Sequence, residues 1–131
     1  MKEITWKYVK ALKDNNAITK LENEVKQILP EDLKQTIKEF NNGRPSFKQF
    51  DTPSIKGCEF KKLLSLNAED TENIFGFLKI DTNIHELLPI ASTPSGDLVC
   101  LHENKIVYWY HETDSVEYLA NSFSEFLNSL Y

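Results

Sequence analysis

Residues 98–110 read LVCLHENKIVYWY, the clearest local pattern in the chain. Its two apolar runs, 98–101 and 106–110, flank four polar residues, and this spacing predicts a β-hairpin. Pairing the last residue of the first run with the first residue of the second places Val99 opposite Tyr108 on one face. The other face is then lined by Leu98, Cys100, Val107 and Trp109. Both faces are apolar and must be covered: helices can cover one, and the second needs other strands, loops or a partner.

The residues before this hairpin show helical periodicity. Apolar side chains recur at helical spacing over residues 4–13 and again over 18–28, which predicts two amphipathic helices. A third helix is expected to begin at Pro30-Glu31-Asp32, with proline and acids in its first turn. It should end at Asn41-Asn42-Gly43, where glycine would take the left-handed conformation that closes a helix.

The remaining segments alternate between strand-like and helical patterns. The sequence predicts an irregular or edge-strand segment at 47–57, strands at 60–66 and 87–91, a short helix at 72–79 and an amphipathic helix at 122–130. Helices first and strands later favour an α+β fold, an antiparallel β-sheet with helices packed on one face. A chain of 131 residues is expected to form a single domain over residues 1–131.

Charge is divided unevenly along the chain, whose net charge is −5. Residues 1–65 carry 13 basic and 9 acidic side chains, a net of +4. Residues 66–131 carry 2 basic and 11 acidic side chains, a net of −9. An acidic half of this density repels nucleic acid and membrane phosphates and attracts a basic partner. The alternative is a solvated acidic face with no partner.

Residues that could carry chemistry do not form a known catalytic pattern. Each histidine precedes a glutamate, but no pair extends to the H-E-x-x-H zinc motif. His102 in the hairpin turn and His111 beyond the next strand would lie over ~15 Å apart, too far to share a metal ion. Neither Cys58 nor Cys100 is paired with a base by the sequence, and no glycine-rich phosphate loop occurs. We therefore expect no catalytic, metal or cofactor site. A small enzyme using His111 or Cys58 is the alternative.

Aromatic residues set among carboxylates remain as the candidate site. Tyrosine and tryptophan anchor protein interfaces, and surrounding acids steer a basic partner. The predicted partner-binding residues are Asp97, Glu103, Tyr108, Trp109, Tyr110, Glu112, Asp114 and Glu117. The alternative for Trp109 is that its ring belongs to the core.

The order of features resembles the SUKH superfamily, which includes fungal cell-wall-synthesis regulators of the Smi/Knr type and many bacterial immunity proteins. The resemblance covers residues 21–130. It rests on these motifs: Leu29-Pro30-Glu31-Asp32, Asn41-Asn42-Gly43, Phe60 with Leu63-Leu64-Ser65-Leu66, Leu88-Pro89-Ile90-Ala91, Gly96-Asp97, Val107-Tyr108-Trp109-Tyr110-His111-Glu112 and Leu119-Ala120-Asn121-Ser122-Phe123-Ser124-Glu125-Phe126-Leu127.

The resemblance implies a SUKH-like α+β domain that acts by binding. Bacterial members resemble antidotes that neutralise a cognate toxin, often a nuclease, so the expected partner is a basic toxin protein. No direct nucleic-acid or membrane partner is expected, and the chain is expected to be a monomer or weak homodimer. The start of the chain lacks the apolar core of a signal peptide, which favours the cytoplasm. A regulatory adaptor inside the cell is the alternative function.

Overall fold

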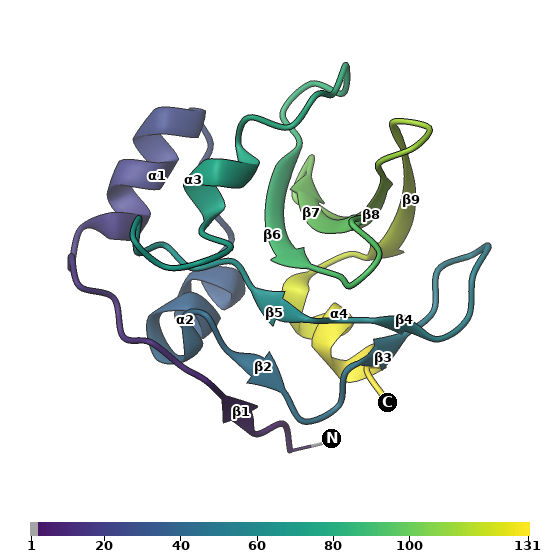
Figure 1. The fold of residues 1–131 in the computed structure, drawn as a ribbon, viewed down its shortest axis with the longest axis horizontal. Coiled ribbons are helices and arrows are strands. Elements are labelled where there is room, and N and C mark those ends of the chain that lie inside the picture. The colour runs from purple at the N-terminus through teal and green to yellow at the C-terminus, as the bar shows by residue number, and fades with distance from the viewer. Residues whose placement is uncertain (1–2) are drawn as a thin grey trace.

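The computed structural model describes residues 3–131, and Figure 1 labels its helices and strands. In chain order they are β1 (Trp6–Lys7), α1 (Ala17–Val25), α2 (Glu31–Phe40), β2 (Arg44–Pro45), β3 (Gln49–Phe50), β4 (Cys58–Glu59), β5 (Lys62–Leu63), α3 (Ile74–Phe77), β6 (Leu88–Ser92), β7 (Leu98–His102), β8 (Lys105–Tyr110), β9 (Ser115–Ala120) and α4 (Phe123–Ser129). The main sheet is antiparallel in the order β5-β6-β7-β8-β9. Two short antiparallel pairs, β1-β2 and β3-β4, complete an α+β fold.

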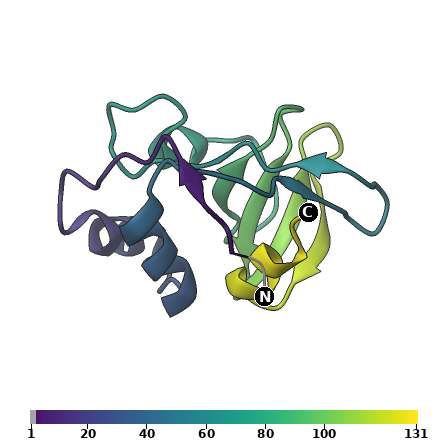
Figure 2. The same cartoon turned by 90° about the horizontal axis from the view of Figure 1, so that it is seen from below.

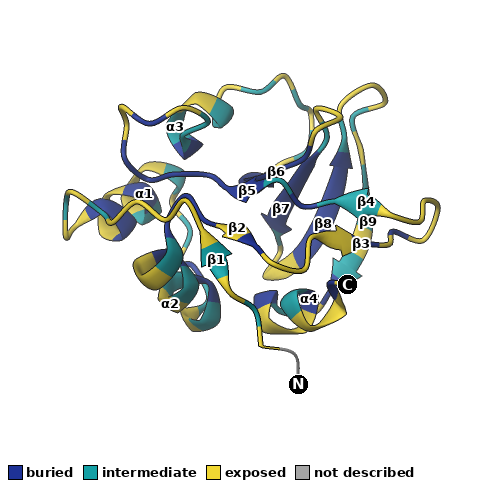
Figure 3. Cartoon of the chain, turned by 60° about the horizontal axis from the view of Figure 1, so that its bottom comes forward, coloured by how far each residue is buried: buried dark blue, intermediate teal, exposed yellow. Residues whose placement is uncertain are grey.

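The hairpin predicted from the sequence is confirmed in its register. Leu101 pairs with Ile106 and Val99 with Tyr108 in the β7-β8 ladder. The two faces of this hairpin enter two different buried clusters, as the alternation requires. Figure 3 shows both strands as almost wholly buried.

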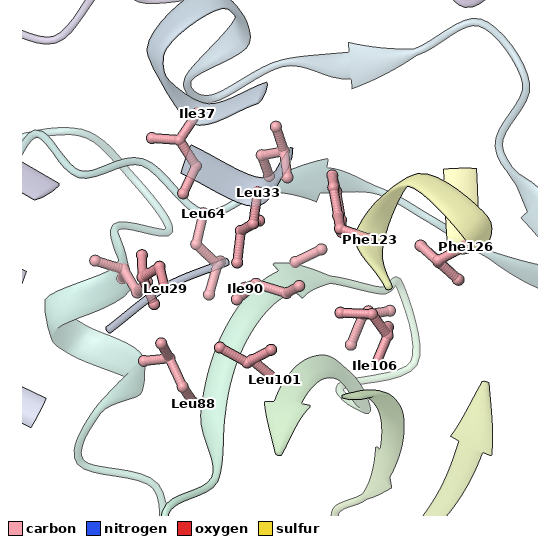
Figure 4. Close-up of a cluster of buried hydrophobic side chains, with 14 of the residues drawn as sticks. Leu29, Leu33, Ile37, Leu64, Leu88, Ile90, Leu101, Ile106, Phe123 and Phe126 are labelled. Atoms are coloured by element: carbon pink, nitrogen blue, oxygen red, sulfur yellow. The ribbon is translucent and has the colours of Figure 1, made fainter. Parts of the chain in front are cut away.

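Helices pack on one face of the sheet, as expected. Figure 2 shows α1 and α2 at one side of the green strands and the yellow α4 beside them. The helical side chains that enter this core include Leu33 and Ile37 of α2 and Phe123 and Phe126 of α4. Figure 4 shows them with the strand residues Leu88, Ile90, Leu101 and Ile106. Each fully buried side chain of this size contributes about 1.5–3 kcal/mol to folding.

The second apolar face of the hairpin is covered from within the chain. Phe77 at the end of α3, and Ile80, Ile84 and Leu87 in the segment that joins α3 to β6, pack against Trp109 and its neighbours. Of the three covers left open by the sequence, a loop is therefore the one used. The apolar hairpin does not need a partner chain to bury it.

The prediction of a first helix is wrong. Residues 4–13 form no helix: they run extended through β1, because Ile4, Trp6 and Leu12 pack on the core while Tyr8 and Val9 are exposed.

The helix α2 ends where predicted, but Asn42, with φ of 70°, takes the left-handed conformation instead of Gly43. Glycine is needed at 43 for space, because a Cβ there would lie 2.7 Å from the Phe40 carbonyl oxygen. The expected strand 60–66 shortens to Lys62–Leu63, and β9 was not predicted.

A buried polar network ties the N-terminal segment to the rest of the fold. Asp70 accepts hydrogen bonds from the Ser65 hydroxyl (2.6 Å) and the Asn67 amide (3.2 Å). Asn41 donates to Ser65 (3.0 Å) and to the backbone oxygen of Lys10 (3.0 Å). The network replaces the expected first helix as the means of holding residues 10–13. Within residues 3–131, no helix has the length and apolar character needed to cross a bilayer.

Candidate functional site

Two turns and a hairpin loop meet at one end of the main sheet. Because Leu98 pairs with Trp109, Asp97 at the start of β7 lies beside the end of β8. Tyr110 pairs with Ser115, so the 111–114 turn lies at the same end. We call Asp97, Glu112, Asp114 and Glu117 the acidic end. Glu112, Asp114 and Glu117 are close in sequence, and the register of the sheet brings Asp97 to them.

The carboxylate of Asp97 accepts four hydrogen bonds, the longest of them from the Ser95 hydroxyl (3.3 Å). The His111 backbone N–H (3.0 Å), the His111 ring Nδ1 (2.6 Å) and the Tyr108 hydroxyl (3.0 Å) all contact its carboxylate. Burial works against ionisation of this group, but these hydrogen bonds outweigh it and hold the pKa of Asp97 below its usual value. Gly96 lies under the imidazole, where a Cβ would be 3.4 Å from His111 Cε1. Asp97 therefore stays ionised at neutral pH.

Asp114 links the segment between α3 and β6, which covers the second face of the hairpin, to the sheet. It accepts hydrogen bonds from the Asn83 backbone N–H (2.7 Å), the Thr82 hydroxyl (2.6 Å) and the Trp109 indole N–H (2.7 Å). These donors, in that order, hold the pKa of Asp114 below its usual value. All three donors are neutral, so the negative charge of the carboxylate is not cancelled.

Glu117 joins β9 to the loop between β3 and β4. The Ser54 hydroxyl donates to it at 2.6 Å, and the Tyr110 hydroxyl forms a second, short hydrogen bond. The Ser54 and Tyr110 bonds hold the pKa of Glu117 below its usual value. Tyr110 also contacts Thr52 in the same loop at 3.1 Å. The loop thus buttresses the acidic end through uncharged groups.

The other predicted site residues take different places. Glu112 is exposed at the tip of the 111–114 turn. Glu103 lies in the β7-β8 turn, at the opposite end of the hairpin, so the structure does not bring it to the acidic end. Tyr108 and Trp109 are only 3% and 5% exposed, which places both rings in the core. Each ring donates a hydrogen bond to a carboxylate of the acidic end: Tyr108 to Asp97, and Trp109 to Asp114.

Lysines of the first half of the chain neutralise only part of the acidic half. Glu69, Asp70 and Glu72 form ion pairs with Lys13, Lys10 and Lys61. Among the described residues, no lysine or arginine forms an ion pair with any carboxylate of the acidic end. The negative charge of the acidic end is therefore not neutralised by ion pairs with lysine or arginine among the described residues.

A comparison with known families identifies the fold. The family model SUKH_6, described as SMI1-KNR4 cell-wall, matches residues 15–127. The chain belongs to the SUKH_6 family. The match confirms the resemblance drawn from the ordered motifs. No curated protein matches the chain.

The sequence missed two features beside the acidic end of this SUKH_6 chain. The exposed apolar residues there are Ile55 in the β3-β4 loop, 43% exposed, and Tyr118 on β9, 47% exposed. A groove of about 390 Å³ runs between that loop and the 93–97 turn, with Ile55, Cys58 and Asp97 in its lining. Tyr118 would have been found had Ser115–Ala120 been predicted as a half-exposed edge strand.

The groove is poorly suited to nucleophilic chemistry. Burial raises the pKa of the Cys58 thiol, outweighing its hydrogen bond with Tyr108, so the thiol stays protonated at neutral pH. Cys100 is buried within β7, which raises the pKa of its thiol far above the usual value. Across residues 3–131 no group of three or more His, Cys, Asp or Glu side chains could hold a metal ion.

Proposed function

We propose that this SUKH_6 protein is an immunity protein that binds a cognate basic toxin, a nuclease, through the acidic end of its sheet. The observation that carries the proposal is the set of ionised carboxylates that hydrogen bonds hold there and that have no lysine or arginine partner among the described residues. Membership of a family related to the SUKH immunity proteins supports the same assignment.

Inhibition follows from charge and shape and needs no chemistry by this chain. A nuclease must carry a basic surface where it grips the phosphate backbone of its substrate. Carboxylates fixed by hydrogen bonds do not have to reorganise on binding, so they can occupy such a surface at low entropic cost. The toxin is then blocked sterically and electrostatically.

The proposed contacts fall into two groups. Glu112, Asp114 and Glu117 face solvent at least in part and would meet basic side chains directly. Tyr118 and Ile55 would supply exposed apolar anchors beside them. Tyr108 and Trp109 act by positioning Asp97 and Asp114. Glu103 would reach only a toxin that extends along the whole hairpin.

Charge reversal tests the proposal. The variant Glu112→Lys/Glu117→Lys is compared with Glu24→Lys/Glu39→Lys, which changes net charge equally on α1 and α2. Association with the toxin encoded by the neighbouring gene is measured by stopped flow at several salt concentrations. Reversal at the acidic end should slow association about tenfold or more and weaken its salt dependence. The α1/α2 variant should lose much less.

Two results would contradict the proposal. One is equal slowing by both variants, which would mean that net charge acts without a docking face. The other is failure of the wild-type protein to bind the neighbouring gene product or to restore growth when the two are co-expressed.

A regulatory adaptor is the second candidate, because the family description names the cell wall. An adaptor would co-purify with a host protein in cells that lack any toxin gene. An adaptor could use the same acidic end, so variants of that surface do not distinguish the two functions. Co-purification from a strain that lacks the toxin gene does.

A further inference from the structure

We infer that the groove beside the β1-β2 ribbon is a binding site for a small phosphorylated ligand. The groove has a volume of about 400 Å³, and its lining includes the cationic side chains of Lys7, Arg44, Lys48 and Lys61. Its lining comes from residues 5–8, 44–48 and 59–61 and contains no residue of the acidic end, although Glu59 also lines the groove beside Asp97. The inference does not depend on the function proposed above.

The ribbon places two like charges opposite one another. Lys7 pairs with Arg44 in the antiparallel register, and both are exposed, while their neighbours Trp6 and Pro45 turn toward the core. Like charges directly opposite on an antiparallel pair destabilise it. Within residues 3–131 no carboxylate forms an ion pair with Lys7, Arg44 or Lys48. An anion in the groove would relieve this repulsion.

Arg44 is oriented for such an anion. Its guanidinium lies over the Tyr8 ring, 5.3 Å from the ring centroid. Stacking of this kind leaves the edge of the guanidinium plane free to donate paired hydrogen bonds, and that fork fits the oxygens of a phosphate. Tyr8 is 69% exposed and has φ of 60°, an unfavourable backbone conformation for a tyrosine. A costly conformation that exposes an aromatic ring beside an arginine is typical of binding sites.

A buried lysine, Lys62, follows Lys61 of the groove lining. Lys62 is buried and donates to the Asn42 side chain and to the Thr71 carbonyl, which are neutral groups. Burial, with smaller contributions from the charges of Arg44 and Lys10, outweighs the attraction of Glu72 and Asp70 and holds the pKa of Lys62 below its usual value. Lys62 thus adds a buried basic side chain that interacts with Arg44 of the groove.

The charge balance of the groove selects the kind of ligand. Lys61 is paired with Glu72 at 2.9 Å, and Glu59 also lines the groove. Lys7, Arg44 and Lys48 remain as three unpaired cations, which suit a compact group carrying two or more negative charges. The acidic half of the chain would repel a long polyanion such as nucleic acid. A small phosphorylated molecule is favoured over a polymer on this ground.

Titration of the protein with inorganic pyrophosphate tests the site. Binding is measured by calorimetry and by changes in amide chemical shifts in NMR spectra. Arg44→Gln should weaken binding about tenfold, the usual effect of losing one charged hydrogen-bonding group. Glu59→Gln should tighten it, because the one opposing carboxylate is removed. Lys38→Gln, an exposed lysine on α2 away from the groove, is the matched control and should bind as the wild type does.

Thermal unfolding supplies an independent reading. Lys7→Gln should raise the melting temperature by about 1–4 °C without ligand, because the cross-strand repulsion is gone. The same variant should lose most of the rise in melting temperature that pyrophosphate gives the wild type.

A hexaglutamate peptide serves as the carboxylate probe. Tighter binding of hexaglutamate than of pyrophosphate would overturn the inference in favour of an acidic protein segment. Absence of binding by pyrophosphate at millimolar concentration, or equal weakening by Arg44→Gln and Lys38→Gln, would overturn it outright.

Discussion

Two groups of carboxylates in the second half of the chain have opposite surroundings. In segment 69–72, each carboxylate forms an ion pair with a lysine from the first half of the chain. At the acidic end, the hydrogen-bonded carboxylates accept from hydroxyl, indole, imidazole and backbone N–H groups. The same residue types therefore serve two purposes. A carboxylate paired with a lysine stabilises the fold, and the lysine neutralises its charge. A carboxylate held by hydrogen bonds from uncharged groups keeps its negative charge, which can attract a binding partner.

The largest expected effect lies in segment 69–72. Asp70→Ala removes the acceptor of the Ser65 hydroxyl and of one Asn67 amide hydrogen inside the fold, although both side chains keep their other hydrogen bonds. The free energy of unfolding should fall by about 3 kcal/mol, since hydrogen bonds to a charged group are lost and their donors stay desolvated. Urea unfolding followed by tryptophan fluorescence measures it. Glu112→Ala, in the exposed turn of the acidic end, is the control and should leave the midpoint unchanged. Equal midpoints for the two variants would remove the distinction drawn here.

Acid unfolding should also depend on Asp70. The Ser65 hydrogen bond, opposed by burial and reinforced by Asn67 and Lys10, holds the pKa of Asp70 below its usual value. The unfolded chain then binds the proton more tightly, so the stabilisation is fully present above about pH 4 and disappears as the pH falls through the lower folded value. Asp70→Asn should flatten the loss of stability below pH 4. A slope identical to that of the wild type, measured by urea unfolding at each pH, would refute this.

The sequence predicted the parts of the fold that local patterns specify. The β7-β8 register was predicted correctly because alternating apolar residues flank a short polar turn, so a slip by one residue would expose the core face. Residues 4–13 were predicted wrongly because their apolar spacing suits a helix equally well. The bonds that hold them extended come from Asn41 and Asn67, more than 25 residues along the chain. No local pattern contains such contacts.

The candidate site shows the same division. The charge count located the acidic half, and the hairpin register would have placed Asp97 beside His111. The sequence could not tell that segment 69–72 is neutralised by lysines, because the partners lie 11 to 60 residues earlier in the chain and only the tertiary fold brings them together. It also placed Trp109 among surface candidates, although its face of the hairpin is covered by a loop whose path follows from tertiary packing.

An intermediate effect is expected at Asp114. This carboxylate joins the covering segment to Trp109 through Thr82, the Asn83 N–H and the indole. In Asp114→Ala the buried indole N–H loses its acceptor and residues 82–83 lose their attachment. Amide hydrogen exchange at Asn83 should speed up and the Trp109 indole resonance should shift, with the fold retained. Glu112→Ala again serves as the control. Unchanged exchange at Asn83 would show that apolar packing alone holds the cover.

The smallest effect concerns the ionisation of Glu117, and it tests the central difference most directly. Ser54→Ala removes one neutral donor, so the pKa of Glu117 should rise toward its usual value while stability hardly changes. Adding Tyr110→Phe removes the second donor and should raise the pKa further. NMR titration of the glutamate carboxyl carbon measures both steps, and Thr113→Ala in the exposed turn is the control. If neutral donors fix the charge, the two steps add in the same direction. A pKa that stays low in the double variant would mean that an unpaired cation governs Glu117, and the acidic end would then resemble segment 69–72.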